Sequence, residues 1–275
     1  MANGRVVSIS HLGPQLDNHY ALAALARIWS RNGFRVHVGR DYDPDASVCI
    51  LHHDLTKQNV VPVAPPGAAH VNAGVLDISK RLISTLSVDA NSDWNGPVIL
   101  KTNGNHFGIP DSWGRPRDLS TKVRVRLRKV SWRLARMLPE AEYPVLNSVS
   151  EVPDWVWRDP EIVVEKFVPE RTADGLYALR GWIFFGNQSY GYRLFATDPL
   201  VKVDTMTHHE YLDEPPEELV ALRQRLKFDF GKFDYVVHDG KPFVFDVNKT
   251  PAFGDDSEEE TPRILRLAQG IEAFL

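Results

Sequence analysis

The chain has 275 residues, of which 43% are hydrophobic and 25% are charged, and its formal net charge is −4. This composition is typical of a soluble protein with a substantial core, and the length is sufficient for two moderate domains. The single cysteine, Cys49, excludes an intramolecular disulfide. No apolar segment approaches the roughly 18 residues of a membrane-spanning helix, and the N-terminus lacks a basic region followed by an apolar stretch, so a cytoplasmic location is expected.

The first 60 residues alternate between strand and helix patterns. Short apolar or β-branched runs at 5–10, 34–38 and 47–51 predict three strands, and apolar residues at helical spacing predict a helix over 17–31. The order strand, helix, strand, strand predicts a small parallel sheet. Residues 10–15 lack the G-x-G-x-x-G pattern of a Rossmann unit, so no dinucleotide site is predicted in this lobe.

A proline-rich stretch at 62–66 predicts a crossing between an N-terminal α/β lobe, residues 1–75, and the rest of the chain, residues 76–275. The second part begins with a helix pattern and a strand pattern, and strand patterns predominate from residue 161 onward. Its predicted elements are a helix at 77–86, strands at 95–101, 162–168, 177–185, 190–195, 233–237 and 242–247, and helices at 215–226 and 261–275. The predicted fold class is therefore α/β plus α+β.

The last two predicted strands form a hairpin, because Asp239-Gly240 between them is a two-residue turn signal. Asp234 lies near the start of the first strand, and Asp246 and Asn248 lie at the end of its partner. In an antiparallel pair these positions are side by side. Three oxygen-bearing side chains suit a hard cation such as Mg²⁺ that is held together with phosphates. Alternatively, they are polar residues that cap the following turn.

Two further segments have both a chemical and an ordinary interpretation. Lys101 ends an apolar strand before a loop with Gly104 and Gly108, where the lysine and backbone N–H groups can bind nucleotide phosphates. Alternatively, it is a strand-end lysine before a turn. Residues 163–168, V-V-E-K-F-V, offer an apolar face and a backbone edge suited to adenine. Alternatively, they form an edge strand with a surface Glu-Lys pair.

The order of these segments resembles the ATP-grasp superfamily over most of residues 70–255, and its most specific part is DYVVHDGKPFVFDVNKTP at 234–251. Members of that superfamily hold ATP between two α+β lobes that follow an N-terminal α/β lobe. The resemblance therefore implies a two-lobed ATP-grasp domain at 76–275, with the nucleotide between its lobes and with ATP and Mg²⁺ as cofactors.

The resemblance also implies three sets of site residues. The nucleotide-binding set is Lys101, Gly104, Gly108, Glu165, Lys166, Phe167 and Val168, of which the last four form the adenine segment. The metal-binding set is Asp234, Asp246 and Asn248. The catalytic set, cations near the transferring phosphate or the carboxylate, is Lys232, Arg193 and Arg180. The two arginines are alternatively ordinary residues of exposed strands, and Asp174 is a candidate for binding the ribose.

The implied reaction joins a carboxylate to an amine through an acyl-phosphate and releases ADP and phosphate, with a small-molecule acid and amine as substrates. Two alternatives remain open: a kinase that phosphorylates a small molecule, and a nucleotide-binding module without turnover. Asp17, Asn18 and His19 follow the first strand at a sheet edge that commonly binds ligands, and they could contact the acceptor. Alternatively, Asp17 caps the first helix.

Residues 115–137 contain nine lysines and arginines and one acid, Asp118. Apolar residues lie between these charges, which favours a solvated helix on the surface of a lobe. The alternative is a docking surface for an acidic partner such as a carrier protein, with nucleic acid a less favoured partner. The acidic run at 255–260 could instead neutralise these cations within the fold. No membrane partner is expected.

Overall fold

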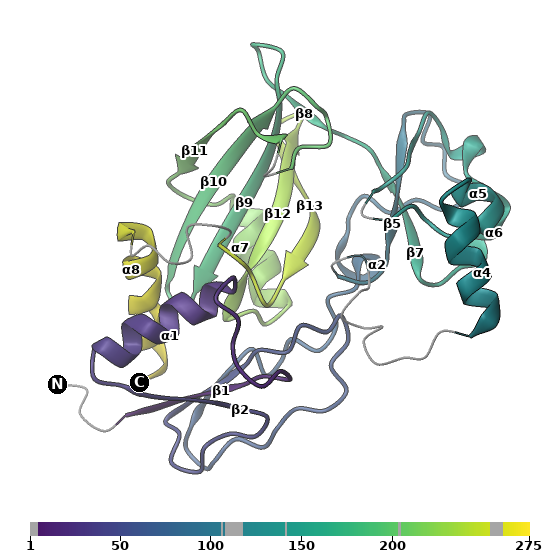
Figure 1. Ribbon diagram of the computed structural model, residues 1–275. Helices are drawn as coiled ribbons and strands as arrows, with labels where there is room; N and C mark the ends of the chain where they lie inside the picture. Colours follow the sequence, from purple (N-terminus) through teal and green to yellow (C-terminus); the bar gives the residue numbers. More distant parts are fainter. Residues whose placement is uncertain (1–4, 106, 108–117, 141, 203–204, 254–260) are drawn as a thin grey trace.

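The computed structural model describes residues 5–105, 107, 118–140, 142–202, 205–253 and 261–275. Three β-sheets with helices around them make up this part of the chain (Figure 1). The first sheet is parallel and the other two are antiparallel, which confirms the predicted combination of α/β and α+β structure. None of the described helices has the length and apolar character to cross a lipid bilayer.

The N-terminal sheet has four parallel strands in the order β2-β1-β3-β4. These strands are β1 (Val6–Ser10), β2 (Arg35–Gly39), β3 (Val48–Leu51) and β4 (Ala69–Val71). Helix α1 (Ala21–Arg31) buries the apolar stripe that the sequence predicts against β1 and β3. Its N-cap is Tyr20, whose side chain makes no capping hydrogen bond, so the interpretation of Asp17 as the helix cap is wrong.

The small sheet has three antiparallel strands in the order β6-β5-β7. Its strands are β5 (Val98–Thr102), β6 (Val145–Leu146) and β7 (Ile162–Lys166). The helices nearest to it in sequence are α2 (Lys80–Ile83), α4 (Leu119–Arg128), α5 (Trp132–Ala135), the 3₁₀ turn η2 (Val149–Glu151) and α6 (Asp154–Arg158). Figure 1 shows α4, α5 and α6 together on the outer side of this sheet.

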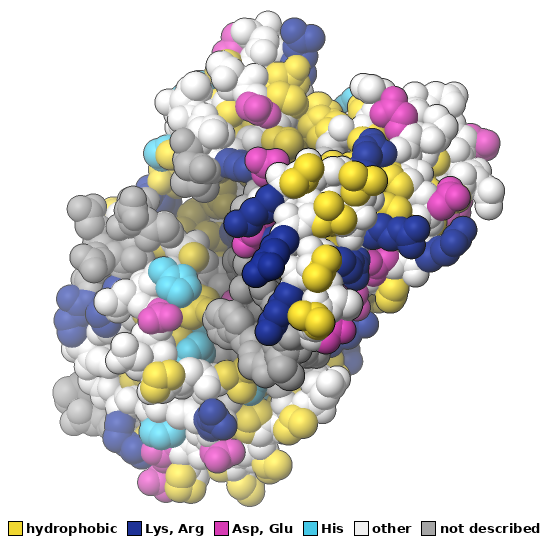
Figure 2. All heavy atoms as spheres, turned by 45° about the vertical axis from the view of Figure 1, so that its right-hand side comes forward, with side chains coloured by type: hydrophobic (Ala, Val, Ile, Leu, Met, Phe, Trp, Pro, Cys, Tyr) yellow, Lys and Arg dark blue, Asp and Glu magenta, His cyan; other side chains and the backbone are white. Residues whose placement is uncertain are grey.

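The basic segment forms two short helices, α4 and α5, and not the single predicted helix. The break follows from local capping, because the Ser131 side chain accepts a hydrogen bond from Leu134 N–H and so starts a new helix. Helix α4 has no buried residue. Figure 2 shows Lys and Arg side chains next to hydrophobic ones on the lobe that carries these helices. Residues 115–117 of the segment lie outside the described residues.

The large sheet is antiparallel, with the order β11-β10-β9-β12-β13 and with β8 paired to β9. Its strands are β8 (Glu170–Arg171), β9 (Tyr177–Phe185), β10 (Gln188–Ala196), β11 (His208–Leu212), β12 (Phe230–His238) and β13 (Lys241–Asn248). The predicted hairpin between β12 and β13 is present. Its turn residues Asp239 and Gly240 have φ of 50° and 75°, as a type I′ turn requires.

One hydrophobic core joins the N-terminal sheet to one face of the large sheet. It contains Ile9 of β1, Leu25 of α1, Phe185 of β9 and Leu267 of helix α8 (Pro262–Gln269). Helices α1 and α8 are in contact although they stand at opposite ends of the chain (Figure 1). The opposite face of the large sheet packs on helix α7 (Glu217–Arg225), and the chain closes in the 3₁₀ turn η5 (Gly270–Phe274).

Candidate active site

The C-terminal hairpin places four polar side chains on one face of the large sheet. Asp234 on β12 lies directly opposite Asp246 on β13. Two positions along each strand, Lys232 lies opposite Asn248. Because side chains alternate between the faces of a strand, all four project from the same face. The structure therefore brings together the three predicted metal ligands and one predicted catalytic cation.

The hydrogen bonding of Asp234 fits a bound cation. Its side chain is largely buried, and its Oδ1 has no hydrogen-bond partner in the part of the chain that the structure describes. Burial raises the pKa of Asp234, although the neighbouring Lys232 opposes this effect. An unused carboxylate oxygen in a buried position is costly, and a cation at this point would satisfy it.

The described residues contain no group of three or more His, Cys, Asp or Glu side chains arranged to hold a metal ion. The set on the hairpin consists instead of two carboxylates and the amide of Asn248. Such a small set leaves coordination positions open. That arrangement suits Mg²⁺, which keeps several waters and is bound by one or two carboxylates together with phosphate oxygens.

Asp234 and Asp246 are each paired with a lysine. Lys232 Nζ lies 2.9 Å from Asp234 Oδ2, and Lys80 Nζ lies 3.0 Å from Asp246 Oδ1. Lys80, on α2, is 4% exposed and also donates to the Gly104 carbonyl oxygen at 3.2 Å. Burial alone would raise the pKa of Asp246, but Lys80, together with Lys101 and Lys232, outweighs burial, and the pKa is lowered. The site therefore holds buried cations close to its carboxylates.

Lys101 connects the small sheet to the same hairpin. Its Nζ lies 2.7 Å from Oε2 of Glu165, a fully buried side chain on the neighbouring strand β7. The same Nζ lies 4.4 Å from the ring centroid of Phe245 on β13. Oε1 of Glu165 has no hydrogen-bond partner among the described residues. Residues predicted for phosphate and for adenine thus meet beside the predicted metal ligands.

The rest of the predicted nucleotide set is less tightly grouped. Lys166 N–H donates to the Leu86 carbonyl oxygen at 2.8 Å, and Phe167 N–H donates to the Pro97 carbonyl oxygen at 2.9 Å. These two N–H groups are therefore already hydrogen-bonded to carbonyl groups near the small sheet. The backbone contact of Val168 with adenine stays a prediction. In the glycine loop, the Gly104 carbonyl oxygen accepts a hydrogen bond from the Lys80 ammonium group. Gly108 lies outside the described residues.

The structure does not bring Arg180 and Arg193 to the face that carries Lys232. Gly181 is the residue opposite Asp234, whereas Arg180 is opposite Tyr235. A displacement of one residue along a strand reverses the face. Arg193, which lies opposite Arg180, shares this other face. The prediction that these arginines face the transferring phosphate therefore has no support from their placement.

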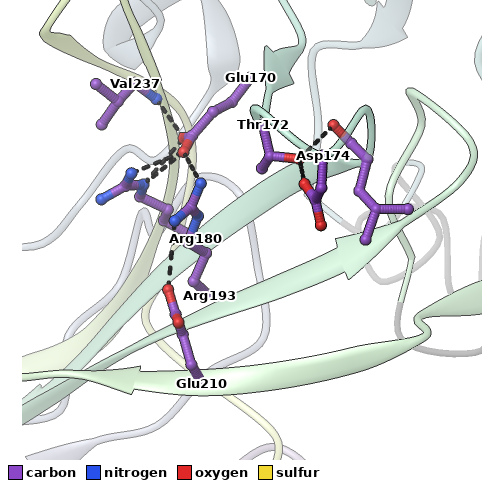
Figure 3. Close-up of polar contacts among 8 residues, drawn as sticks. Glu170, Thr172, Asp174, Arg180, Arg193, Glu210 and Val237 are labelled. Carbon is purple, nitrogen blue, oxygen red and sulfur yellow. Dashed lines mark hydrogen bonds and ion pairs between the residues drawn. The ribbon is translucent and has the colours of Figure 1, made fainter.

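Both arginines bind Glu170, as Figure 3 shows. Arg180 Nη2 lies 2.7 Å from Glu170 Oε1, and Arg193 Nη2 lies 3.1 Å from the same atom. Glu170 Oε2 also accepts the Val237 N–H at 2.8 Å. In the same view Asp174, the candidate for ribose, accepts a hydrogen bond from the Thr172 hydroxyl in an exposed turn. The Glu170 cluster thus satisfies a buried carboxylate.

The C-terminal edge of the N-terminal sheet adjoins the hairpin. The Thr250 hydroxyl lies 3.0 Å from Asp54 Oδ1 and 3.1 Å from Asn248 Oδ1. Close to Asp54, the Tyr20 ring packs on the fully buried ring of His52, with 4.7 Å between their centroids. The ring of His19, one of the residues expected near an acceptor, packs on the Tyr20 ring at a tilt, with 4.0 Å between the centroids. The predicted ligand edge is therefore lined with imidazole and phenol groups.

Sequence reasoning missed Lys80, Tyr192 and Thr250. The Tyr192 hydroxyl hydrogen-bonds to Lys232, and burial raises its pKa. No short motif marks these residues. Lys80 becomes part of the site only because α2 packs on β13, which is distant in the sequence. For Thr250 a signal was present, since it follows the predicted ligand Asn248 by two residues in the Asn-Lys-Thr-Pro turn.

No protein-family model and no curated protein matches the sequence. Solved structures do match over nearly the whole chain. One is the ATP-grasp ligase PsnB in complex with a phosphomimetic variant of its minimal precursor, Mg and ADP, with a TM-score of 0.55, 11% identity, and coverage of 98% of this chain and 97% of that one. Another is the macrocyclase MdnC from Microcystis aeruginosa MRC, bound with the precursor peptide MdnA, with a TM-score of 0.52, 10% identity, and coverage of 98% and 99%. At these identities the similarity is one of fold.

Proposed function

The chain has the ATP-grasp fold, and on this premise we propose that it is an ATP- and Mg²⁺-dependent ligase that joins a carboxylate to an amine. The observation that carries the proposal is the single face on which Asp234, Asp246, Asn248 and Lys232 lie together. Two carboxylates, an amide and a partly buried lysine on one face of the hairpin suit a metal-bound triphosphate.

In this proposal Asp234, Asp246 and Asn248 hold Mg²⁺, which when bound neutralises charge on the phosphate oxygens. Lys80 and Lys101 now pair with carboxylates, and the phosphates of ATP would give both ammonium groups a second anionic partner. Glu165, Lys166, Phe167 and Val168 line the adenine, and Gly104 and Gly108 belong to the loop over the phosphates.

The proposed reaction has two steps. A carboxylate oxygen of the substrate attacks the γ-phosphorus, a new O–P bond forms, and the bond to the leaving ADP breaks. An amine nitrogen then attacks the acyl carbon, and phosphate leaves. Lys232 lies on the metal face and would offset the charge that develops on the transferring group. Arg180 and Arg193 have another role here, which is to hold Glu170 and the strands around it.

The test is MgATP-dependent ADP release with a panel of carboxylic acids, followed by trapping with hydroxylamine. A ligase of this type gives a hydroxamate, because hydroxylamine captures the acyl-phosphate. Asp234→Asn is expected to lower the rate at least about 100-fold, since it removes a carboxylate from the charged centre. Asp239→Asn is the matched control on the same hairpin, where the side chain is 90% exposed. ADP release without hydroxamate would favour the kinase alternative, and nucleotide binding without ADP release would favour the non-catalytic module.

We further propose a peptide as a substrate partner, with α4 as its docking surface. PsnB and MdnC were each solved with a precursor peptide. On α4, the exposed cations Lys122, Arg126 and Lys129 follow at intervals of four and three residues and so share one side of the helix. An exposed apolar row, Leu119, Val123 and Leu127, lies beside them. A basic row next to an apolar row fits an acidic amphipathic segment.

The charge-reversed triple variant Lys122→Glu, Arg126→Glu, Lys129→Glu tests this surface. A fluorescent acidic amphipathic peptide is expected to bind the wild-type chain with a salt-dependent affinity and to bind the variant at least about tenfold more weakly. ADP release with small acids should be unchanged, because α4 contributes no residue to the hairpin site. Equal binding of the peptide by both chains would contradict the docking surface and would leave the ligase proposal intact.

A further inference from the structure

A cavity of about 190 Å³ lies between the large sheet and α8, on the face of the sheet that carries the candidate active site. Lys232 is part of its wall. Because Lys232 Nζ is 2.9 Å from Asp234, the cavity begins next to the predicted metal ligands. Any group bound in it would therefore lie beside the transferring phosphate of the proposed reaction.

Most of the cavity wall is aromatic or aliphatic. Tyr190, Tyr192 and Leu194 contribute from β10, Tyr211 contributes from β11, and Phe253 contributes from the segment after the hairpin. Leu194 is 7% exposed, so its side chain belongs to the buried part of the lining. Apolar walls with a few polar groups are characteristic of sites that bind the organic part of a small molecule.

The backbone of β9 is adapted to this arrangement at Gly181. A Cβ added there would meet the ring of Tyr192 at 2.1 Å, so only glycine allows the ring to lie this close to the strand. In that position the Tyr192 hydroxyl hydrogen-bonds to Lys232. Gly181 and Tyr192 thereby join the apolar wall of the cavity to the catalytic cation.

A second cation, Arg263 of α8, also lines the cavity. The Arg263 guanidinium carbon is 3.6 Å from the ring centroid of Tyr211 and 5.8 Å from that of Tyr190. Stacking of this kind holds the rings in place, and it positions a positive charge over the aromatic wall. The cavity wall thus contains two cations, Lys232 and Arg263, as well as aromatic rings.

Resting on the proposed ligase function, we infer that this cavity binds the organic group of the substrate acid, and that this group is an aromatic ring or an apolar group of similar size. The carboxylate of such an acid would point to Lys232 and the γ-phosphate. The volume supports a single ring, because an apolar cavity of roughly 150 Å³ accepts benzene. Short acids would leave the cavity empty, and acids with a cationic tail would place that charge against apolar walls and near Arg263.

The inference is tested by calorimetric binding of 3-phenylpropionate and of propionate to the full chain saturated with Mg²⁺ and ADP. The two acids share a carboxylate and differ in the ring. We expect 3-phenylpropionate to bind at least about tenfold more tightly, because burial of the ring adds apolar contact. Equal affinities, or no binding of 3-phenylpropionate, would overturn the inference.

Two variants locate the binding in this cavity. Leu194→Trp fills it and is expected to weaken 3-phenylpropionate binding at least about tenfold, whereas Leu265→Trp, on an exposed side of α8, should not change it. Tyr211→Ala removes one ring of the wall, and it decides the question if Leu194→Trp does not fold. If Leu194→Trp folds and its affinity for 3-phenylpropionate is unchanged, the inference is overturned. If it does not fold, unchanged affinity in Tyr211→Ala overturns the inference.

The outcomes separate this inference from the ligase proposal. Binding of 3-phenylpropionate in the cavity without hydroxamate formation would keep the assignment of an aromatic acid as ligand and would contradict ligation of that acid. Hydroxamate formation with propionate as efficient as with 3-phenylpropionate would keep the ligase proposal and would contradict the aromatic substrate class.

Discussion

Three lysines of the candidate active site each hold a carboxylate, and this pairing explains how so many charges are buried together. Lys101 binds Glu165, Lys232 binds Asp234, and the third pair joins Lys80 to Asp246. A buried charge without a partner is costly, so each side of a pair makes burial of the other possible. The arrangement also holds three ammonium groups in fixed positions, so a bound triphosphate would meet these cations without a rearrangement of the site.

Lys80 is the residue whose role is most sharply tested by substitution. Lys80→Met keeps the apolar stem and removes the charge that Asp246 and the Gly104 carbonyl bind. We expect the KM for ATP to rise at least about tenfold, because the phosphate contact of the proposed site is lost and Asp246 is left without the lysine that pairs with it. Steady-state measurement of ADP release checks this result.

Lys57→Met is the matched control for that substitution. Lys57 also pairs with an aspartate, Asp77, but its side chain is 60% exposed and the pair spans 3.5 Å. A pair of this kind contributes little, so the KM for ATP should stay at the wild-type value. A similar rise in both variants would contradict the role of Lys80 in nucleotide binding.

At the scale of elements, the close approach of η5 to β9 fixes the C-terminal end of the chain on the large sheet. A Cβ at Gly270 would lie 2.0 Å from the Phe185 carbonyl oxygen, and a Cβ at Gly186 would lie 2.3 Å from the Gly270 carbonyl oxygen. These are backbone contacts, which cannot relax by rotation of a side chain. The two glycines therefore allow a packing distance that no other residue permits.

Gly270→Ala is expected to lower the free energy of unfolding by about 1–3 kcal/mol, because the added methyl group overpacks a backbone contact. Chemical denaturation of the wild-type chain and the variant gives the difference directly. Glu272→Ala, at an exposed position of the same turn, should change the stability by less than about 0.5 kcal/mol. Equal stability of Gly270→Ala and the wild type would contradict the conclusion that the backbone contact between residue 270 and Phe185 requires glycine.

At the scale of the whole molecule, the junction between the N-terminal sheet and the hairpin contains buried histidines. His53 bonds to the Ser10 hydroxyl at 2.8 Å and to the Gln58 amide at 2.9 Å. Burial, with a smaller effect of Lys249, lowers the pKa of His53 to about 4. Burial likewise lowers the pKa of His52. The folded chain therefore keeps both imidazoles neutral in a range where an unfolded chain binds protons.

This difference predicts a loss of stability in mild acid. Below the ordinary histidine pKa of about 6.5, the unfolded state binds more protons at position 53 than the folded state does, so stability falls as the pH falls from about 6.5 to about 4. After allowance for solvent screening we expect a loss of about 1–2 kcal/mol from His53. His53→Gln should reduce the pH dependence of the free energy of unfolding over that range. An unchanged dependence would contradict this assignment.

The elements that the sequence predicted well are those whose information is local. The β12–β13 hairpin follows from alternation and from Asp239-Gly240, and the convergence of Asp234 with Asp246 follows from antiparallel pairing alone. The faces of Arg180 and Arg193 could not be obtained in this way. Their faces depend on the register of β9 against β12, which interactions between distant segments decide.

Hydrophobic periodicity and turn residues by themselves determined the longer strands and most of the longer helices, because each depends on neighbours within a few positions. The short strands β4, β8 and β11 were not among the predicted elements. The local pattern also determined which oxygen-bearing side chains share a hairpin face. Only the tertiary structure decided that Lys80 pairs with Asp246, that the N-terminal sheet and α8 share a core, and that a cavity opens beside Lys232. Such contacts join segments far apart in the chain. Their geometry depends on how the helices and sheets of the whole chain pack together, and no local sequence pattern specifies it.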